Sequence, residues 1–272
     1  QIRAIDSDFY LTLLAHEGRL DDAEKFATEV TTGNYSAGIA ANLSLAGIHS
    51  KNYLKAIEYA SLALSLDSSN SDALTNLAAA YNAVSRYDAT VQLAEAFNVS
   101  GLRSPGFFCN VGAAFDHVGQ YQSAEKFYRK SLDLDPTLVN ASINLGCLLL
   151  SEGRYSEAWP HYCKGVSLPS RQPYLSVREL HSVEQDVQVL IVHGDGGIGD
   201  ILVFLPYFKK LEGIDCYLEA PEKLRSLIES NFRIRVFNTQ NPLPEQVSRS
   251  GRSISLQKIP LIFGPHSPEE LD

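Results

Sequence analysis

The stretch that decides the fold of this chain is Phe107–Pro136, FFCNVGAAFDHVGQYQSAEKFYRKSLDLDP. Its apolar residues recur at helical spacing before and after a short turn at 117–120. Gly119 lies in this turn, and glycine readily adopts the positive φ with which many helices end. Pro136 then stops the second helical segment. The stretch therefore predicts a helix, a tight turn and a second helix.

The same pattern returns every 34 residues over the first two thirds of the chain. An asparagine followed by an apolar and a small residue occurs at Asn42, Asn76, Asn110 and Asn144. Each copy is followed by a turn and then by a tyrosine, at Tyr53, Tyr87, Tyr121 or Tyr155. Self-similarity at a fixed period indicates stacked copies of one supersecondary unit.

This pattern resembles the tetratricopeptide repeat. The resemblance implies units over 37–70, 71–104, 105–138 and 139–172, preceded by a looser copy at about 4–36. We therefore expect residues 1–172 to form a mainly α superhelix of ten antiparallel helices. The turns between paired helices are expected near Gly18, Lys51, Ser85, Gly119 and Gly153. In stacked repeats of this kind the first helix of each pair lines a concave face.

The asparagine series has two interpretations. Asparagine is a poor residue for a helix interior because its amide competes for the backbone, so its recurrence needs a reason. Each amide could bridge neighbouring helices, or the amides could line the groove unpaired and bind the backbone of an extended peptide. The repeats of O-linked N-acetylglucosamine transferase are similar here, and that family uses such asparagines to hold peptides. The expected groove residues are Asn42, Asn76, Asn110, Asn144, Leu45, His49 and His117.

Composition excludes some partners. The chain has 272 residues and a net charge of -9, which argues against nucleic acid or an anionic membrane as the main partner. It contains no apolar run long enough to span a bilayer and no secretory signal peptide. Its four scattered cysteines fit no metal-ligand spacing and predict a cytoplasmic protein without a metal site. Because the chain starts at Gln1 and lacks methionine, we interpret it as a fragment or a processed form.

The sequence changes character after residue 172. Residues 173–186 are expected to be a short helical connector. Strands are then predicted over Val187–Val192, Ile214–Glu219 and Ile234–Phe237, with helices over 200–211 and 221–230 between them. Alternation of this kind predicts a small α/β domain over 187–272, with a Rossmann-like parallel sheet.

The loop after the first of these strands lies within Val189–Pro206, VLIVHGDGGIGDILVFLP. Gly194, Gly196 and Gly199 fit the dinucleotide pattern, and Glu219 stands where a ribose-binding acid would stand. This favours an NAD-dependent oxidoreductase as one alternative. Pro206 weakens that alternative because it should kink the helix after the loop. Only 86 residues follow Asp186, which is too few for the second half of a dinucleotide fold.

Residues Gly197–Pro206, GIGDILVFLP, resemble the family 9 glycosyltransferases, which are heptosyltransferase-like enzymes of the two-domain GT-B type. Bacterial proteins that join tetratricopeptide repeats to such a domain are known. The resemblance implies an acceptor-side half-domain with Asp200 as general base and a loop of Gly194, Gly196, Gly197 and Gly199. Asp200 could instead simply favour the start of a helix, and the glycines could simply form a tight turn.

In that family a second domain binds the nucleotide-sugar donor, and this chain lacks it. We therefore expect a scaffold that binds a protein or peptide, carrying an incomplete glycosyltransferase-like domain without a cofactor of its own. As given, the chain is expected to be inactive. A longer native form would be a glycosyltransferase that acts on a sugar acceptor.

Overall fold

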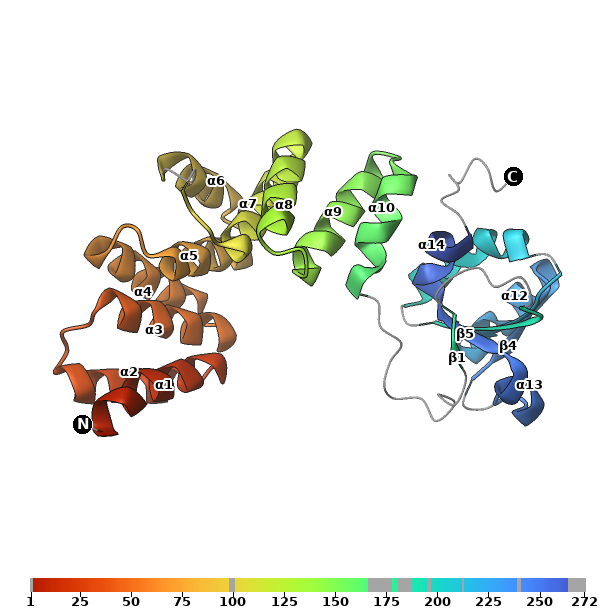
Figure 1. Cartoon of the computed structure of the whole chain (residues 1–272), viewed down its shortest axis with the longest axis horizontal. Coiled ribbons are helices and arrows are strands. Elements are labelled where there is room, and N and C mark those ends of the chain that lie inside the picture. Colours follow the sequence, from red (N-terminus) through yellow and green to blue (C-terminus); the bar gives the residue numbers. More distant parts are fainter. Residues whose placement is uncertain are drawn as a thin grey trace. The chain divides into compact units, whose positions relative to one another are not determined.

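The computed structural model describes residues 2–97, 101–165, 178–180, 187–194, 197–211, 213–238 and 241–263. The chain divides into two compact units, residues 1–144 and 145–272. The first unit is helical, and the second joins the end of the helical part to a parallel sheet (Figure 1).

Residues 2–165 form paired helices, and no strand occurs among the described residues of this range. The pairs are α1 (Ile2–His16) with α2 (Leu20–Thr31), α3 (Ala37–His49) with α4 (Tyr53–Leu66), α5 (Ser71–Ala83) with α6 (Tyr87–Ala96), α7 (Pro105–His117) with α8 (Tyr121–Leu134), and α9 (Val139–Ser151) with α10 (Tyr155–Tyr162). Four of the first helices thus begin at the first residue of a predicted unit. The predicted mainly α fold with a small parallel sheet is confirmed.

The turn inside each pair uses a left-handed residue. The φ angles are 68° at Gly18, 63° at Lys51, 60° at Ser85, 77° at Gly119 and 74° at Gly153. The residue after the turn donates its N–H back into the first helix, as Arg86 does to the carbonyl of Tyr81 at 2.8 Å. This 6→1 bond is typical of a helix that ends in a left-handed residue. The five predicted turn positions are confirmed.

Small residues allow the paired helices to approach closely. A Cβ added at Gly47 would lie 2.9 Å from the backbone nitrogen of Ala56. A Cβ added at Gly112 would lie 2.7 Å from the ring of Tyr128, while Ala124 is fully buried. The small residues in the repeat are therefore packing residues.

The second unit contains a five-stranded sheet of order β1-β5-β2-β3-β4, in which each neighbouring pair is parallel. Its strands are β1 (Arg178–Glu179), β2 (Val189–His193), β3 (Asp215–Glu219), β4 (Ile234–Phe237) and β5 (Arg252–Ser255). The three predicted strands correspond to β2, β3 and β4. The connector prediction was wrong for 178–179, because pairing of Arg178 with the distant Arg252 makes this segment a strand.

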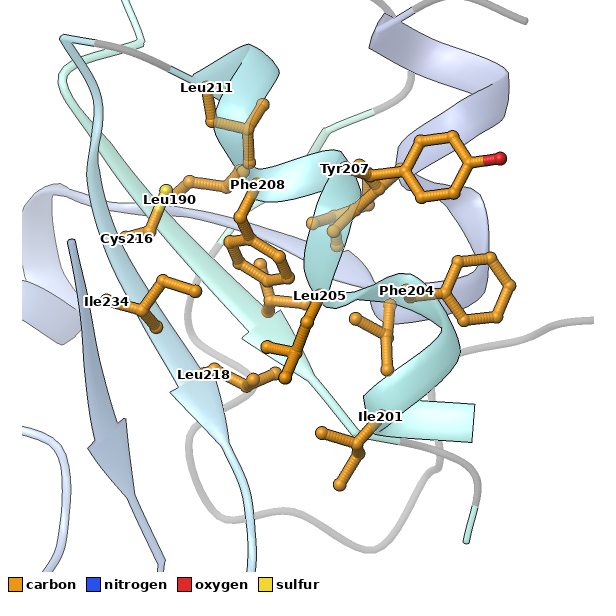
Figure 2. Close-up of a cluster of buried hydrophobic side chains, with 14 of the residues drawn as sticks. Leu190, Ile201, Phe204, Leu205, Tyr207, Phe208, Leu211, Cys216, Leu218 and Ile234 are labelled. Carbon is orange, nitrogen blue, oxygen red and sulfur yellow. The ribbon is translucent and has the colours of Figure 1, made fainter. Parts of the chain in front are cut away.

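One face of the sheet is covered by α11 (Ile198–Phe204) and the 3-10 helix η2 (Leu205–Leu211). Figure 2 shows Ile201, Leu205 and Phe208 from these helices over Leu190, Leu218 and Ile234 of the strands. The α-helix gives way to the 3-10 helix at Leu205, immediately before Pro206. Because proline lacks the N–H that the α-helix needs, this confirms the expected break.

Helix α10 belongs to the same core. Trp159 is 4% exposed, and its ring centroid lies 5.8 Å from that of Phe204 and 6.0 Å from that of Tyr207. The thiol of Cys163 donates to the carbonyl of Gln257 at 3.0 Å. Both contacts lie within the second unit, so the second helix of the fifth pair forms part of the α/β core.

The opposite face of the sheet carries a smaller cluster of Ile191, Tyr217, Phe237 and Leu243, against which α13 (Glu245–Ser250) packs through Val247. The remaining elements are η1 (Cys163–Gly165), η3 (Glu222–Leu224), α12 (Arg225–Asn231), η4 (Leu256–Lys258) and α14 (Ile259–Phe263). Within the part of the chain that the structure describes, no helix is long and apolar enough to cross a membrane.

Candidate peptide groove and sheet-edge site

Some of the accessible residues of α3, α5 and α7 occupy equivalent positions of the 34-residue period and recur at helical spacing, which places them on one face of each helix. They are Asn42, Leu45 and His49 on α3, Asp72, Ala79 and Ala83 on α5, and Gly106, Asn110, Ala113 and His117 on α7. We call this set the groove face. Its floor is small and mostly apolar, which lets a guest backbone approach closely. Ala41 and Cys109, which precede Asn42 and Asn110 in these helices, are buried in the core.

Of the two interpretations of the asparagine series, unpaired amides were the wrong one for three of the residues, because their amide nitrogens bridge neighbouring helices. Nδ2 of Asn76 donates to the carbonyl of Ala41 at 3.0 Å, and Nδ2 of Asn110 donates to the carbonyl of Thr75 at 3.3 Å. Nδ2 of Asn42 donates to the hydroxyl of Thr12 at 3.3 Å. Each bond joins the first helix of one pair to the first helix of the preceding pair. Stacking of the repeats brings these two helices close enough for the amide to bridge them.

The amide oxygens of these asparagines differ from the amide nitrogens in their hydrogen bonding. Among the described residues, Oδ1 of Asn42, Asn76 and Asn110 accepts no hydrogen bond. Asn42 and Asn110 are half-buried, whereas Asn76 is 8% exposed. The preceding pair thus orients each amide and leaves its acceptor unused. Asn144 lies half-buried on α9 at the equivalent position.

Sequence reasoning missed a further interhelical amide, at Asn82. Nδ2 of Asn82 donates to the carbonyl of Asn110 at 2.8 Å, and its Oδ1 accepts from the hydroxyl of Thr90 at 2.8 Å. Asn82 is outside the recurring series, so periodicity gave no signal for it. Both the nitrogen and the oxygen of the Asn82 amide bond to other helices. In Asn42, Asn76 and Asn110 only the nitrogen does so among the described residues.

Two predicted groove residues also take part in contacts between pairs. Nδ1 of His49 lies 2.8 Å from the carbonyl oxygen of His16. The ring of His117 stacks on Tyr87, with centroids 4.1 Å apart and planes within 9°. Leu45 packs at the edge of the core around α1, α2 and α3. These residues belong to the groove face and also pack against neighbouring helices.

The groove face is uncharged or acidic. Helices α3, α5 and α7 contain no lysine or arginine, and their acids are Asp72 and Asp116. Asp72 is exposed, whereas Asp116 is half-buried and burial raises its pKa. The described residues contain no group of three or more side chains that could hold a metal ion.

The second candidate site lies at the carboxyl end of the sheet. Val192 pairs with Leu218, so His193 and Glu219 follow side by side on β2 and β3. Nδ1 of His193 lies 3.0 Å from Oε2 of Glu219. On the other side His193 pairs with Ser255 of β5, whose buried hydroxyl has no hydrogen-bond partner in the described part of the chain. Ligands of open parallel sheets collect at this end.

The His193–Glu219 pair has a defined chemical capacity. When Nδ1–H donates to the carboxylate, the imidazole is fixed with Nε2 as an acceptor. Nε2 has no hydrogen-bond partner among the described residues. A histidine held in this way could accept a proton from a ligand hydroxyl that reached it, but His193 is only 2% exposed in this structure. Glu219, the predicted ribose-binding acid, therefore has a histidine as its neighbour.

The glycine loop has a packing role at its first residue. A Cβ at Gly194 would lie 2.4 Å from the carbonyl oxygen of Glu219, so only glycine fits beside the end of β3. Gly197 accepts the N–H of Ile201 at 3.2 Å, and a Cβ at Gly199 would meet nothing within 4 Å. Gly196 lies outside the described residues. Asp200 lies in α11, but its side chain is outside the described part of the structure.

Comparison with known proteins bears on the helical part. Residues 106–138 match the tetratricopeptide repeat family. Small glutamine-rich tetratricopeptide repeat-containing protein 2 of Mycosarcoma maydis is 41% identical over 70 residues, which are 25% of this chain and 20% of that protein. The match thus spans one fifth of this curated relative.

Comparison with solved structures finds similar chains, of which one reaches a TM-score of 0.50. PilF of Pseudomonas aeruginosa is 22% identical, with 61% of this chain and 79% of that chain covered and a TM-score of 0.50. MamA, at 21% identity, covers 60% of this chain and 95% of its own, with a TM-score of 0.45. Together with the 34-residue period and the left-handed turns, the match at 106–138 supports tetratricopeptide repeats in the helical part of this chain.

Proposed function

We propose that the repeats bind an extended segment of another protein along the groove face of α3, α5 and α7. The observation that carries this proposal is the oriented amide oxygens at the half-buried Asn42 and Asn110, with the buried Asn76 between them and small residues such as Ala79 and Ala113 beside them. An amide oxygen can accept a backbone N–H from any residue type. The binding therefore depends little on the sequence of the guest.

The charges of the groove face define the guest further. Helices α3, α5 and α7 contain no lysine or arginine, so the face offers neither side chain to a terminal carboxylate or an acidic residue of the guest. The exposed Asp72 favours a neutral or basic segment. The guest is an internal stretch with small apolar residues and occasional lysine or arginine.

The test uses fluorescently labelled 12-residue peptides of neutral, basic and acidic composition, with affinities measured by anisotropy. Asn110→Ala should weaken the best binder by about 0.5–1.5 kcal/mol, the net scale of one hydrogen bond. Ala113→Glu should weaken basic peptides less than neutral ones because it adds an acid to the floor. Asn82→Ala is the matched control, since it removes an interhelical amide that is fully used within the protein.

Two outcomes would contradict the proposal. If Asn82→Ala weakens binding as much as Asn110→Ala, the effect arises from destabilised helices and not from the groove. If no peptide class binds, the groove is not a peptide site at all.

We propose a second function for the α/β part, in which a longer native form transfers sugar from a nucleotide-sugar. Two features support it: the resemblance of Gly197–Pro206 to family 9 glycosyltransferases, and the His193–Glu219 pair at the ligand end of the sheet. Asp200 would be the general base, and His193 would orient the acceptor hydroxyl.

Calorimetry on both the given and a longer form tests this second function. The given chain should bind neither UDP-sugars nor NAD. In an active longer form Asp200→Asn should abolish turnover and leave nucleotide-sugar binding intact, and His193→Asn should raise the KM for acceptor. Unchanged turnover in both variants would remove this end of the sheet from the mechanism, and tight NAD binding by the given chain would favour the oxidoreductase alternative.

A further inference from the structure

The first helix of the array exposes two apolar side chains on one face. Tyr10 is 41% exposed and Leu13 is 43% exposed, and they lie three residues apart on α1. Tyr10 contacts Phe26 of α2 edge-on at 4.9 Å, so its ring covers the pair only partly. Single exposed apolar residues are common, but two on one helical face call for comparison with the other repeats.

The left-handed turn residues fix which positions are equivalent. Gly18 corresponds to Lys51, Ser85 and Gly119, so α1 is offset from α3 by 33 residues and the later first helices by 34. By this alignment Tyr10 corresponds to Leu43, Leu77 and Val111, and Leu13 corresponds to Ala46, Ala80 and Ala114. All six of these residues are buried. The two exposed positions of α1 are therefore core positions in every other pair of the first unit.

The structure also shows what covers these positions elsewhere. Leu43 and Ala46 of α3 share a cluster with Leu20, Ala23 and Ala27, which lie on one face of α2. The second helix of the preceding pair thus supplies small residues and a leucine that close the face. Buried alanines at equivalent positions recur on α4, at Ala56 and Ala60.

We infer that the Tyr10–Leu13 face of α1 docks the second helix of a further hairpin of the same type, stacked ahead of α1. The occupant continues an interface that the protein already uses between its own pairs. An end repeat that caps such an array has a polar outer face, whereas this face presents Tyr10 and Leu13 to solvent. The surface therefore fits an alanine-lined amphipathic helix and not a polar partner.

The experiment adds such a hairpin to the chain. A copy of residues 37–70 is joined directly ahead of Ala4, the equivalent of Ala37, and amide exchange in α1 is compared with that of the unmodified chain. We expect exchange in α1 to slow at least tenfold and the thermal midpoint to rise. Leu13→Asp should abolish both changes in the extended chain while leaving the unmodified chain nearly unaffected.

Leu54→Asp is the control, because Leu54 is 77% exposed and corresponds to Asp21, Asp88 and Gln122, all polar. It should leave the gain from the added hairpin intact. Unchanged exchange in α1 after the extension would overturn the inference. Self-association of the unmodified chain that Leu13→Asp abolishes would also overturn it, since a second copy would then cover the face.

Discussion

The carboxylate of Glu229 accepts the backbone N–H of Val236 at 2.9 Å, on the outer edge of the last strand of the sheet. Beside it, Nη1 of Arg225 donates to the carbonyl of Val236 at 2.8 Å and to Glu229 at 2.9 Å. Two side chains of α12 thus take the place of a neighbouring strand. An exposed strand edge is a template for pairing with other chains, and this arrangement blocks it.

Removing this acceptor should open the edge. We expect Glu229→Ala to lower the free energy of unfolding by about 1–3 kcal/mol, since it leaves a backbone donor without a partner. It should also cause concentration-dependent association, measured by sedimentation velocity. Glu229→Gln should restore most of the stability because its amide oxygen can still accept. Glu95→Ala, at an exposed acid on α6, is the control and should change neither property.

Two glycines of α3 should respond oppositely to the same substitution. Gly47→Ala places a Cβ 2.9 Å from the backbone of Ala56 and should cost about 1–3 kcal/mol, because backbone cannot yield as a side chain can. Gly38→Ala meets only Ser36 Oγ at 4.0 Å and should stabilise by about 0.5–1 kcal/mol. Urea denaturation of both variants measures this. Equal effects would contradict the close approach of α3 and α4.

Replacing the non-glycine turn residues by glycine should raise the stability of the protein. Lys51 and Ser85 hold φ angles of 63° and 60°, which cost an L-residue about 1–2 kcal/mol. Glycine removes this strain but adds freedom to the unfolded chain, so Lys51→Gly and Ser85→Gly should each stabilise by about 0.5–1 kcal/mol. Gly119→Ala, at φ 77°, should destabilise by a similar amount in the same thermal melts. A destabilising Ser85→Gly would show that its hydroxyl matters more than the strain.

The four cysteines should differ in the rate at which their thiols react. Burial raises the pKa of Cys109 to about 11 and the pKa of Cys163 and Cys216 to about 12, whereas Cys147 is exposed. Because the thiolate is the nucleophile, Cys147 should react first with a thiol reagent at pH 8. Mass spectrometry of briefly labelled protein identifies the modified residue. Labelling of Cys216 before Cys147 would contradict the packing of β3.

The same pKa shifts predict alkaline instability. The folded state holds these three thiol protons more tightly than the unfolded chain, whose cysteines titrate near 9. Their contribution to stability is therefore complete below pH 9 and is lost as pH rises from 9 towards 12. Urea midpoints should fall across that window, and Cys216→Ala should reduce the slope. A slope that Cys216→Ala leaves unchanged would assign the effect to other groups.

Local patterns predicted much of this protein. The 34-residue period identified the helix pairs and placed the turns at Gly18, Lys51, Ser85, Gly119 and Gly153, because helix ends are governed by nearby residues. Pro206 predicted the end of α11 for the same reason. The three apolar strands β2, β3 and β4 were also predictable from their alternation with helical segments in the sequence.

Contacts between distant residues decided the rest. The asparagine series was visible in sequence, but only stacking of the pairs brought Asn110 to the carbonyl of Thr75 and turned an expected free amide into a bridging one. The proximity of His193 to Glu219 arises from the pairing of β2 with β3.

The sequence by itself thus determined the repeats and their turns, since these depend on residues within one turn or one period. Tertiary structure decided where Trp159 belongs: its indole packs with Phe204 and Tyr207, forty and more residues away, and makes a repeat helix part of the α/β core. Periodicity cannot carry that information, because a helix shows the same apolar spacing whichever partner buries it.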